Sequence, residues 1–102
     1  MAKNLKIAEA FKKARQGISS DEYDFICHAL DGITYRPSRK TCDEARRIIA
    51  ERMGCRPDKL CPTLESWVWG NIMDGEYSRW PTPEEMKFYR LRWLDSLIAE
   101  FS

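Results

Sequence analysis

Signals for helix beginnings divide this chain more clearly than any other feature of its sequence. The pattern Ser/Thr-x-x-Glu begins at Ser19, Thr41 and Thr82, the last of which is followed by a proline. In such a capping box the hydroxyl accepts a hydrogen bond from the third helical amide, and the glutamate reaches back to the amide of the cap residue. Proline suits the first position of a helix. Three helices are therefore predicted to begin at these points.

Glycines mark the predicted helix ends. Gly17, Gly32 and Gly54 each follow a segment with apolar residues at helical spacing, where helices commonly end on a left-handed residue. No stretch alternates apolar and polar residues between hairpin turns, so no sheet is expected. The predicted helices cover residues 3–16, 20–31, 42–53, 64–73 and 83–101.

The fold class predicted from these segments is all-α. With 102 residues, of which 43% are hydrophobic, the chain is long enough for one domain, residues 1–102, with a single core. We expect a compact bundle of about five helices. The C-terminal helix is the longest and has a wide apolar stripe, so it is predicted to be the central element.

Two arginines occupy apolar stripes. Arg90 lies between Met86, Trp93 and Leu97 in the last helix, and Arg52 lies at the edge of the stripe of the third helix. Both are predicted to be buried charges, which need a partner because an unpaired buried charge is very costly. We favour a structural role, in which Arg90 pairs with a carboxylate of a neighbouring helix or extends along its stem to reach solvent. The alternative is a pocket that receives an anionic group.

An aromatic cluster is the first candidate binding surface. Trp67 and Trp69 are two residues apart on a predicted helix, so only one of them can share the apolar face. Trp69 is therefore either a second packing contact or part of an exposed patch. That patch would contain Trp69, Met73, Tyr77 and Trp80. Exposed aromatic and methionine side chains are typical of protein–protein contacts, including self-association, so a homodimer also stays open.

A basic loop is the second candidate binding surface. The segment from Arg36 into the third helix contains five cations: Arg36, Arg39, Lys40, Arg46 and Arg47. Such a set before a helix start could meet phosphates. However, carboxylates four residues before and after Arg47 would neutralise part of it. We therefore favour a protein partner and keep nucleic acid as the alternative.

Neither a metal site nor a catalytic site is predicted. Asp21, Asp24, His28 and Asp31 would form one polar stripe of the second predicted helix, which is more typical of a solvated acidic face than of a cation site. Cys55 and Cys61 are too far apart in sequence for a zinc knuckle,. No catalytic or phosphate-binding motif is present. We expect no enzyme activity and no cofactor.

Three stretches carry a resemblance to a known group of proteins. They are "FICHAL" (25–30), "LESW" (64–67) and "RLRWLDSLIAEF" (90–101). Together they resemble a pattern in small, uncharacterised helical accessory proteins of tailed bacteriophages. The resemblance implies a viral protein of the host bacterial cytoplasm that binds and inhibits a host protein complex, in particular an anti-phage defence complex, as an anti-CRISPR-like inhibitor does.

Charge and hydropathy limit the alternatives to that function. The formal net charge is +1, which gives no general attraction to nucleic acid or to acidic membranes. No apolar run is long enough to span a membrane, and the charged N-terminal residues do not resemble a secretory signal. A nucleic-acid or nucleotide-binding protein and a structural or assembly component of the virion stay open as the other two functions.

Overall fold

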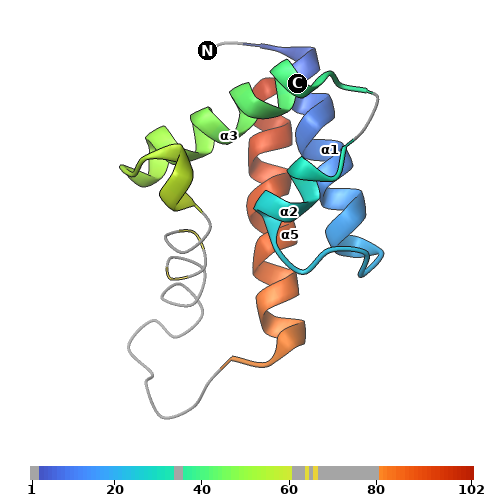
Figure 1. Cartoon of the computed structure of the whole chain (residues 1–102). Helices are drawn as coiled ribbons and strands as arrows, with labels where there is room; N and C mark the ends of the chain where they lie inside the picture. Colours follow the sequence, from blue (N-terminus) through green and yellow to red (C-terminus); the bar gives the residue numbers. More distant parts are fainter. Residues whose placement is uncertain (1–2, 34–35, 61–63, 65, 67–80) are drawn as a thin grey trace.

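The protein is mostly helical in the part of the chain that the computed structural model describes, which is residues 3–33, 36–60, 64, 66 and 81–102. The helices are α1 (Leu5–Ser19), α2 (Ile26–Asp31), α3 (Arg39–Met53), a short 3-10 helix (Pro57–Lys59) and α5 (Pro83–Phe101) (Figure 1). No strand occurs among these residues, so the prediction of an all-α fold is confirmed. The predicted helix 64–73 falls almost entirely outside the described residues.

The beginning of α5 matches its sequence signal. The amide of Glu85 donates to the hydroxyl of Thr82 at 3.1 Å, and the amide of Thr82 donates to the carboxylate of Glu85 at 2.9 Å. Both halves of the capping box are therefore present, and Pro83 occupies the first turn. The prediction of a helix over residues 83–101 is confirmed.

The beginning of α3 lies one turn earlier than predicted. Its N-cap is Ser38, whose hydroxyl accepts a hydrogen bond from the amide of Thr41 at 3.3 Å. Thr41 is thus inside the first turn, and the capping box predicted there is wrong. Ser38 and Thr41 are both residues that cap helices well, and they stand three positions apart. The cis peptide bond between Arg36 and Pro37 precedes the cap.

The predicted helix 20–31 is shorter than its sequence suggests. α1 continues to Ser19, and the hydroxyl of Ser20 donates backwards to the carbonyl of Gly17 at 3.3 Å. Asp21 then has a φ of 63°, a left-handed conformation that ends a helix and that aspartate tolerates better than most residues. α2 begins only at Ile26. The capping box predicted at Ser19 is wrong because these polar residues close α1 instead of opening α2.

Of the three glycines predicted to end helices, Gly54 has the left-handed conformation, with a φ of 67° at the end of α3. Gly17 lies inside α1, and Gly32 ends α2 in a right-handed conformation. These two glycines make room for Tyr23. A Cβ atom at Gly17 would lie 2.9 Å from the ring of Tyr23, and one at Gly32 would lie 2.0 Å from its hydroxyl. A side chain at either position would clash with Tyr23, which explains why both residues are glycine.

The core is arranged around α1. Within the described residues α1 packs against α2, α3 and α5, and the C-terminal helix α5, which was predicted to be central, packs mainly against α1. The buried residues of α1 cover a wide arc and are mostly small: Ile7, Ala8, Ala10, Phe11, Ala14, Gly17 and Ile18. Small side chains let helices approach from several sides. The apolar stripe of α5 is buried at Leu94, Leu97 and Phe101 and half-buried at Met86, Tyr89 and Trp93.

Polar contacts join both ends of the antiparallel pair formed by α1 and α5 (Figure 1). The amide of Asn4 donates to the carbonyl of Phe101 at 2.9 Å. Arg15 is bonded to Asp95 at 2.5 Å, and Lys87 to Asp21 at 3.0 Å. The pair is thus fixed in register along its whole length. None of the helices in the described residues is long and apolar enough to cross a membrane.

Arg52 connects α3 to α5 and is not buried. Its side chain is 42% exposed, so the prediction of a buried charge is wrong at this position. The guanidinium forms two hydrogen bonds with the carboxylate of Glu100 and lies 5.5 Å from the centre of the Phe101 ring. Its stem covers apolar surface while its charge meets both solvent and a carboxylate. The hydrogen bond from Arg52 holds the pKa of Glu100 below its usual range.

Removal of the Glu100 charge should change how stability depends on pH. Because its pKa is lowered in the folded state, the pair stabilises the fold above the ordinary glutamate pKa of about 4.3, and this contribution disappears as the pH falls through the lower folded value. We expect urea midpoints of the wild type and Glu100→Gln to differ at pH 7 and to approach each other as the pH falls below the ordinary glutamate pKa,. Glu9→Gln, at an exposed position of α1, should show no such convergence. Parallel wild-type and Glu100→Gln profiles would contradict the prediction.

Substitution of Gly32 should test the contact with Tyr23. In Gly32→Ala the new methyl group meets the Tyr23 hydroxyl and ring, and the ring also lies close to Gly17. Overpacking of this kind typically costs about 1–3 kcal/mol. We expect such a loss in urea unfolding of Gly32→Ala, and a much smaller effect of the same change in a Tyr23→Ala background. Equal losses in both backgrounds would show that the ring is not the cause.

Candidate functional site

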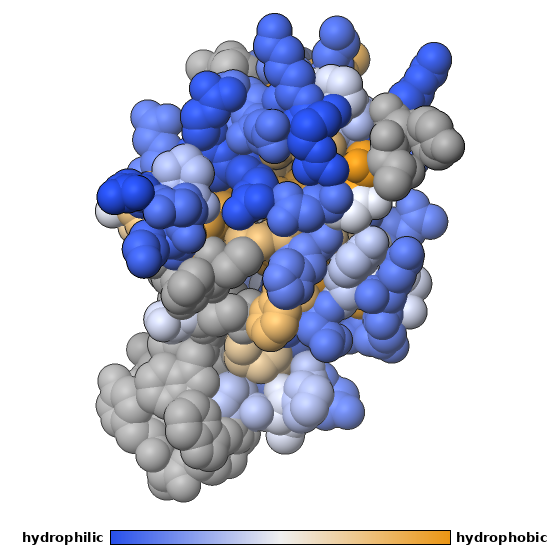
Figure 2. Space-filling model, in the orientation of Figure 1, coloured by the Kyte–Doolittle hydropathy of each residue, from blue (hydrophilic) through white to orange (hydrophobic). Residues whose placement is uncertain are grey.

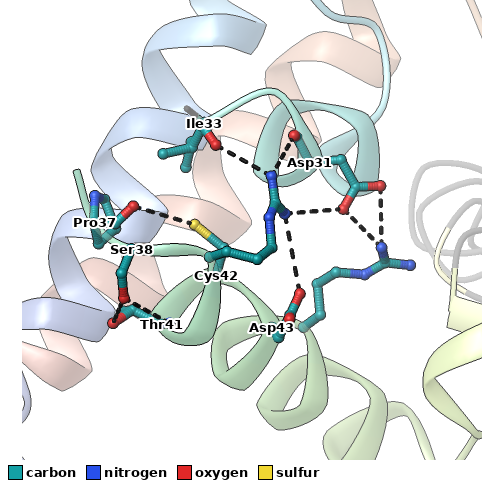
Figure 3. Close-up of polar contacts among 9 residues, drawn as sticks. Asp31, Ile33, Pro37, Ser38, Thr41, Cys42 and Asp43 are labelled. Carbon is teal, nitrogen blue, oxygen red and sulfur yellow. Dashed lines mark hydrogen bonds and ion pairs between the residues drawn. The ribbon is translucent and has the colours of Figure 1, made fainter. Parts of the chain in front are cut away.

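Arg39, one of the cations predicted to meet a partner, serves the fold instead. Its Nη2 atom donates to the backbone carbonyls of Asp31 and Ile33, at 2.7 and 3.2 Å (Figure 3). Its Nη1 atom lies 3.7 Å from the carboxylate of Asp31 and 4.0 Å from that of Asp43. Arg39 therefore satisfies the carbonyls that the end of α2 leaves without helical partners.

Two further arginines of α3 are also paired. Arg46 donates from Nη1 to both carboxylate oxygens of Asp31, at 2.8 and 3.0 Å, so that two arginines share one aspartate. Arg47 pairs with Glu44 at 2.8 Å within the same helix. Most of the positive charge that the sequence assigns to this segment is thus neutralised locally, and Arg39 and Arg46 hold the end of α2 against α3.

Arg36 and Lys40 differ from their neighbours. Both are exposed, and neither forms a hydrogen bond or ion pair within the described part of the chain. Arg36 lines two hollows on either side of it. One, of about 400 Å³, also contains Lys6, and the other, of about 270 Å³, also contains Lys13. The fold therefore brings a cation of the loop next to two lysines that are far away in the sequence.

The two hollows follow one stripe of α1. Lys6, Glu9, Lys13 and Gln16 line them, and these positions recur every three or four residues, as the neighbours on one helix face do. We call Lys6, Lys13 and Arg36 the cationic face. Figure 2 shows hydrophilic side chains over most of the visible surface, with apolar surface between them. The sequence shows the excess of cations in both segments, but only the packing of the loop against α1 unites them.

Arg90 lies in a different part of the structure, away from Lys6, Lys13 and Arg36. It is only 7% exposed, and its guanidinium lies 5.3 Å from the centre of the Phe25 ring. It lines a hollow of about 460 Å³ together with Lys87, Asp21, Asp24 and Glu84. Three carboxylates beside two cations do not favour an anionic ligand. The geometry therefore gives little support to the anion pocket considered for Arg90.

The aromatic candidates Trp69, Met73, Tyr77 and Trp80 lie outside the described residues. Among the described residues, the large hydrophobic side chains with substantial exposure are Leu5 (72%), Phe88 (55%) and Phe25 (38%). Leu5 lies at the first position of α1 and lines the same hollow as Lys6 and Arg36. Sequence patterns did not single it out, because one apolar residue at a helix start is not distinctive.

The predicted acidic stripe does not form. Asp21 and Asp24 lie in the turn before α2, while Asp31 is bonded to arginines. The described residues contain no group of three or more histidine, cysteine or acidic side chains that could hold a metal. Cys27 is buried whereas His28 is exposed beside Phe25, so the two do not form a nucleophile and base. Burial raises the pKa of the Cys42 thiol. Cys61 lies outside the described residues.

Comparison of the chain with protein-family models, with curated proteins and with solved structures found no match in any of the three.

Removal of the shared carboxylate should loosen the junction of α2 and α3. Asp31→Asn keeps the size of the side chain but removes the charge that Arg39 and Arg46 share. Exposed ion pairs contribute up to about 1 kcal/mol, and we expect a loss of that order in the urea-derived free energy of unfolding. Asp58→Asn, which affects only the local pair with Arg56, should change stability by less than about 0.5 kcal/mol. Equal effects of the two changes would contradict the role assigned to Asp31.

Proposed function

We propose that this protein is a non-catalytic accessory protein of a tailed bacteriophage that binds a host bacterial protein through its cationic face. The single observation that carries the proposal is that Arg36, which precedes α3, lines one hollow with Lys6 and another with Lys13, two lysines of one stripe of α1. Arginines elsewhere in the described chain are used differently. Those paired with carboxylates are Arg15, Arg39, Arg46, Arg47, Arg52 and Arg56.

Charge complementarity explains what such a face would do. A patch of cations attracts a partner with an acidic surface, speeds its association and disfavours partners of like charge. Binding of this kind needs neither a cofactor nor a reactive group. The partner that we propose is a component of a host complex, in particular one that defends the bacterium against phage. This assignment to a host target in the bacterial cytoplasm rests on the resemblance of residues 25–30, 64–67 and 90–101 to phage proteins.

Nucleic acid is the second candidate for the same face. A single observation favours it, namely that Arg36 and Lys40 are exposed cations at the start of α3. However, Arg39, Arg46 and Arg47 are already paired, and Glu9 interrupts the stripe on α1. Nucleic-acid affinity grows with the number of phosphates that are neutralised. The few cations that remain are therefore better suited to a protein partner. A virion component is the third candidate, and its abundance in purified particles would reveal it.

Charge reversal should test the proposed function. In the variant Lys6→Glu/Lys13→Glu/Arg36→Glu we expect recovery of the partner from a nuclease-treated bacterial lysate to fall by about tenfold or more, measured by quantitative mass spectrometry. The matched control is Arg56→Glu/Lys59→Glu/Arg92→Glu, which makes the same change of net charge at exposed positions elsewhere. This control should retain binding, and helical circular dichroism should be unchanged in both variants.

Two outcomes would contradict the proposal. Equal recovery by both variants would show that the cationic face is not the interface. Loss of all recovery on nuclease treatment, together with retention of the protein on DNA or RNA that falls steeply with salt, would instead indicate nucleic-acid binding.

A further inference from the structure

The hollow between the start of α1 and the start of α3 combines apolar and cationic groups. It has a volume of about 400 Å³. Leu5 supplies exposed apolar surface, and Lys6 and Arg36 add two cations beside one carboxylate, that of Glu9. Pro37 also lines the hollow but is itself buried. In Figure 1 the beginnings of α1 and α3 lie at the same end of the molecule, and the two helices pack together. The walls of the hollow therefore come from two elements of the folded core.

Leu5 is not required by the core. Its side chain is 72% exposed, although the next residues inward on α1, Ile7 and Ala8, are buried. An exposed leucine alone is ordinary on a protein surface. An exposed leucine that lines a hollow between two cations is a better contact for a partner, because apolar anchors surrounded by charged or polar groups are the usual arrangement of protein interfaces.

The polar groups of the hollow are partly committed to the fold. Ser38 and Thr41 are hydrogen-bonded to each other at 3.2 Å, and the Ser38 hydroxyl caps α3. Lys6 and Arg36 have no ion pair within the described residues. The hollow thus offers two cations, the single carboxylate of Glu9 and an exposed leucine, but few additional hydrogen-bonding groups. A phosphate backbone would use the cations and leave the leucine uncovered.

From these observations we infer that the hollow is an anchor site for an acidic segment of the partner protein, in which one large apolar side chain is flanked by carboxylates. The apolar side chain covers Leu5, and the carboxylates lie against Lys6 and Arg36. This inference rests on the proposed function and specifies the chemistry of the segment that the cationic face receives.

The experiment uses blocked peptides as probes and the ¹⁵N-labelled full chain at low salt. The probe Asp-Glu-Leu-Glu-Asp should shift the amide signals of residues 5–9, 36 and 38–41 and saturate. The same peptide with serine in place of the leucine should bind roughly tenfold more weakly, because the apolar contact is lost. Leu5→Ser in the protein should weaken the leucine peptide by a similar factor. Phe88→Ser, at another exposed apolar residue, should leave its binding unchanged.

Several results would overturn the inference. Equal affinity for the leucine and serine peptides would show that charge alone acts there. A DNA duplex that shifts the same amides, with no effect of Leu5→Ser, would assign the hollow to nucleic acid. If neither peptide binds while the charge-reversal variant still loses the lysate partner, the inference fails and the proposed function stands. If that variant also retains the partner, both fail.

Discussion

The structure depends on the burial of α1 on several sides. Its small residues, Ala8, Ala10, Ala14 and Gly17, are almost fully enclosed, so that α2, α3 and α5 can all approach the same helix. Close packing of this kind requires small side chains, because a larger one would push a neighbouring helix away. The exposed remainder of α1 is then confined to a narrow stripe, and the loop before α3 is packed beside that stripe. The location of the cationic face is thus a consequence of how the core is built.

Electrostatic pairing separates cations that build the fold from those left for solvent or a partner. Asp31 receives two arginines, and Glu100 receives another across the α3–α5 junction. These pairs are exposed and individually weak, yet they fix the relative positions of elements that share little core. Among the cations of α1, Arg15 is paired with Asp95, whereas Lys6 and Lys13 have no ion pair within the described residues, and Glu9 and Glu22 are the carboxylates that line the hollows with them. The cationic face is therefore distinguished by cations that lack an ion pair, and not by the net charge of the chain, which is nearly neutral.

The sequence predicted the fold class well and the helix ends unevenly, for identifiable reasons. Thr82 is followed by proline, which can only begin a helix there, and its capping box forms. Ser20 has no such restriction, and its hydroxyl closes α1 instead. Gly17 was misassigned because a glycine that admits an aromatic ring has the same sequence signal as one that ends a helix. The central position of α1 was missed because alanines contribute little to an apolar stripe, however completely they are buried.

The candidate site was predictable only in part, since Arg36 and Arg39 look alike in sequence. Whether such a residue reaches a partner or a backbone carbonyl depends on the turn before α3, which no periodicity describes.

The bond between Asn4 and the carbonyl of Phe101 has a mechanical consequence. Because α1 and α5 are antiparallel, tension applied between these two residues pulls at the same end of the pair. The contacts between the two helices would then break one turn at a time from that end. The force needed to separate the helices would be far lower than if all their contacts had to shear at once.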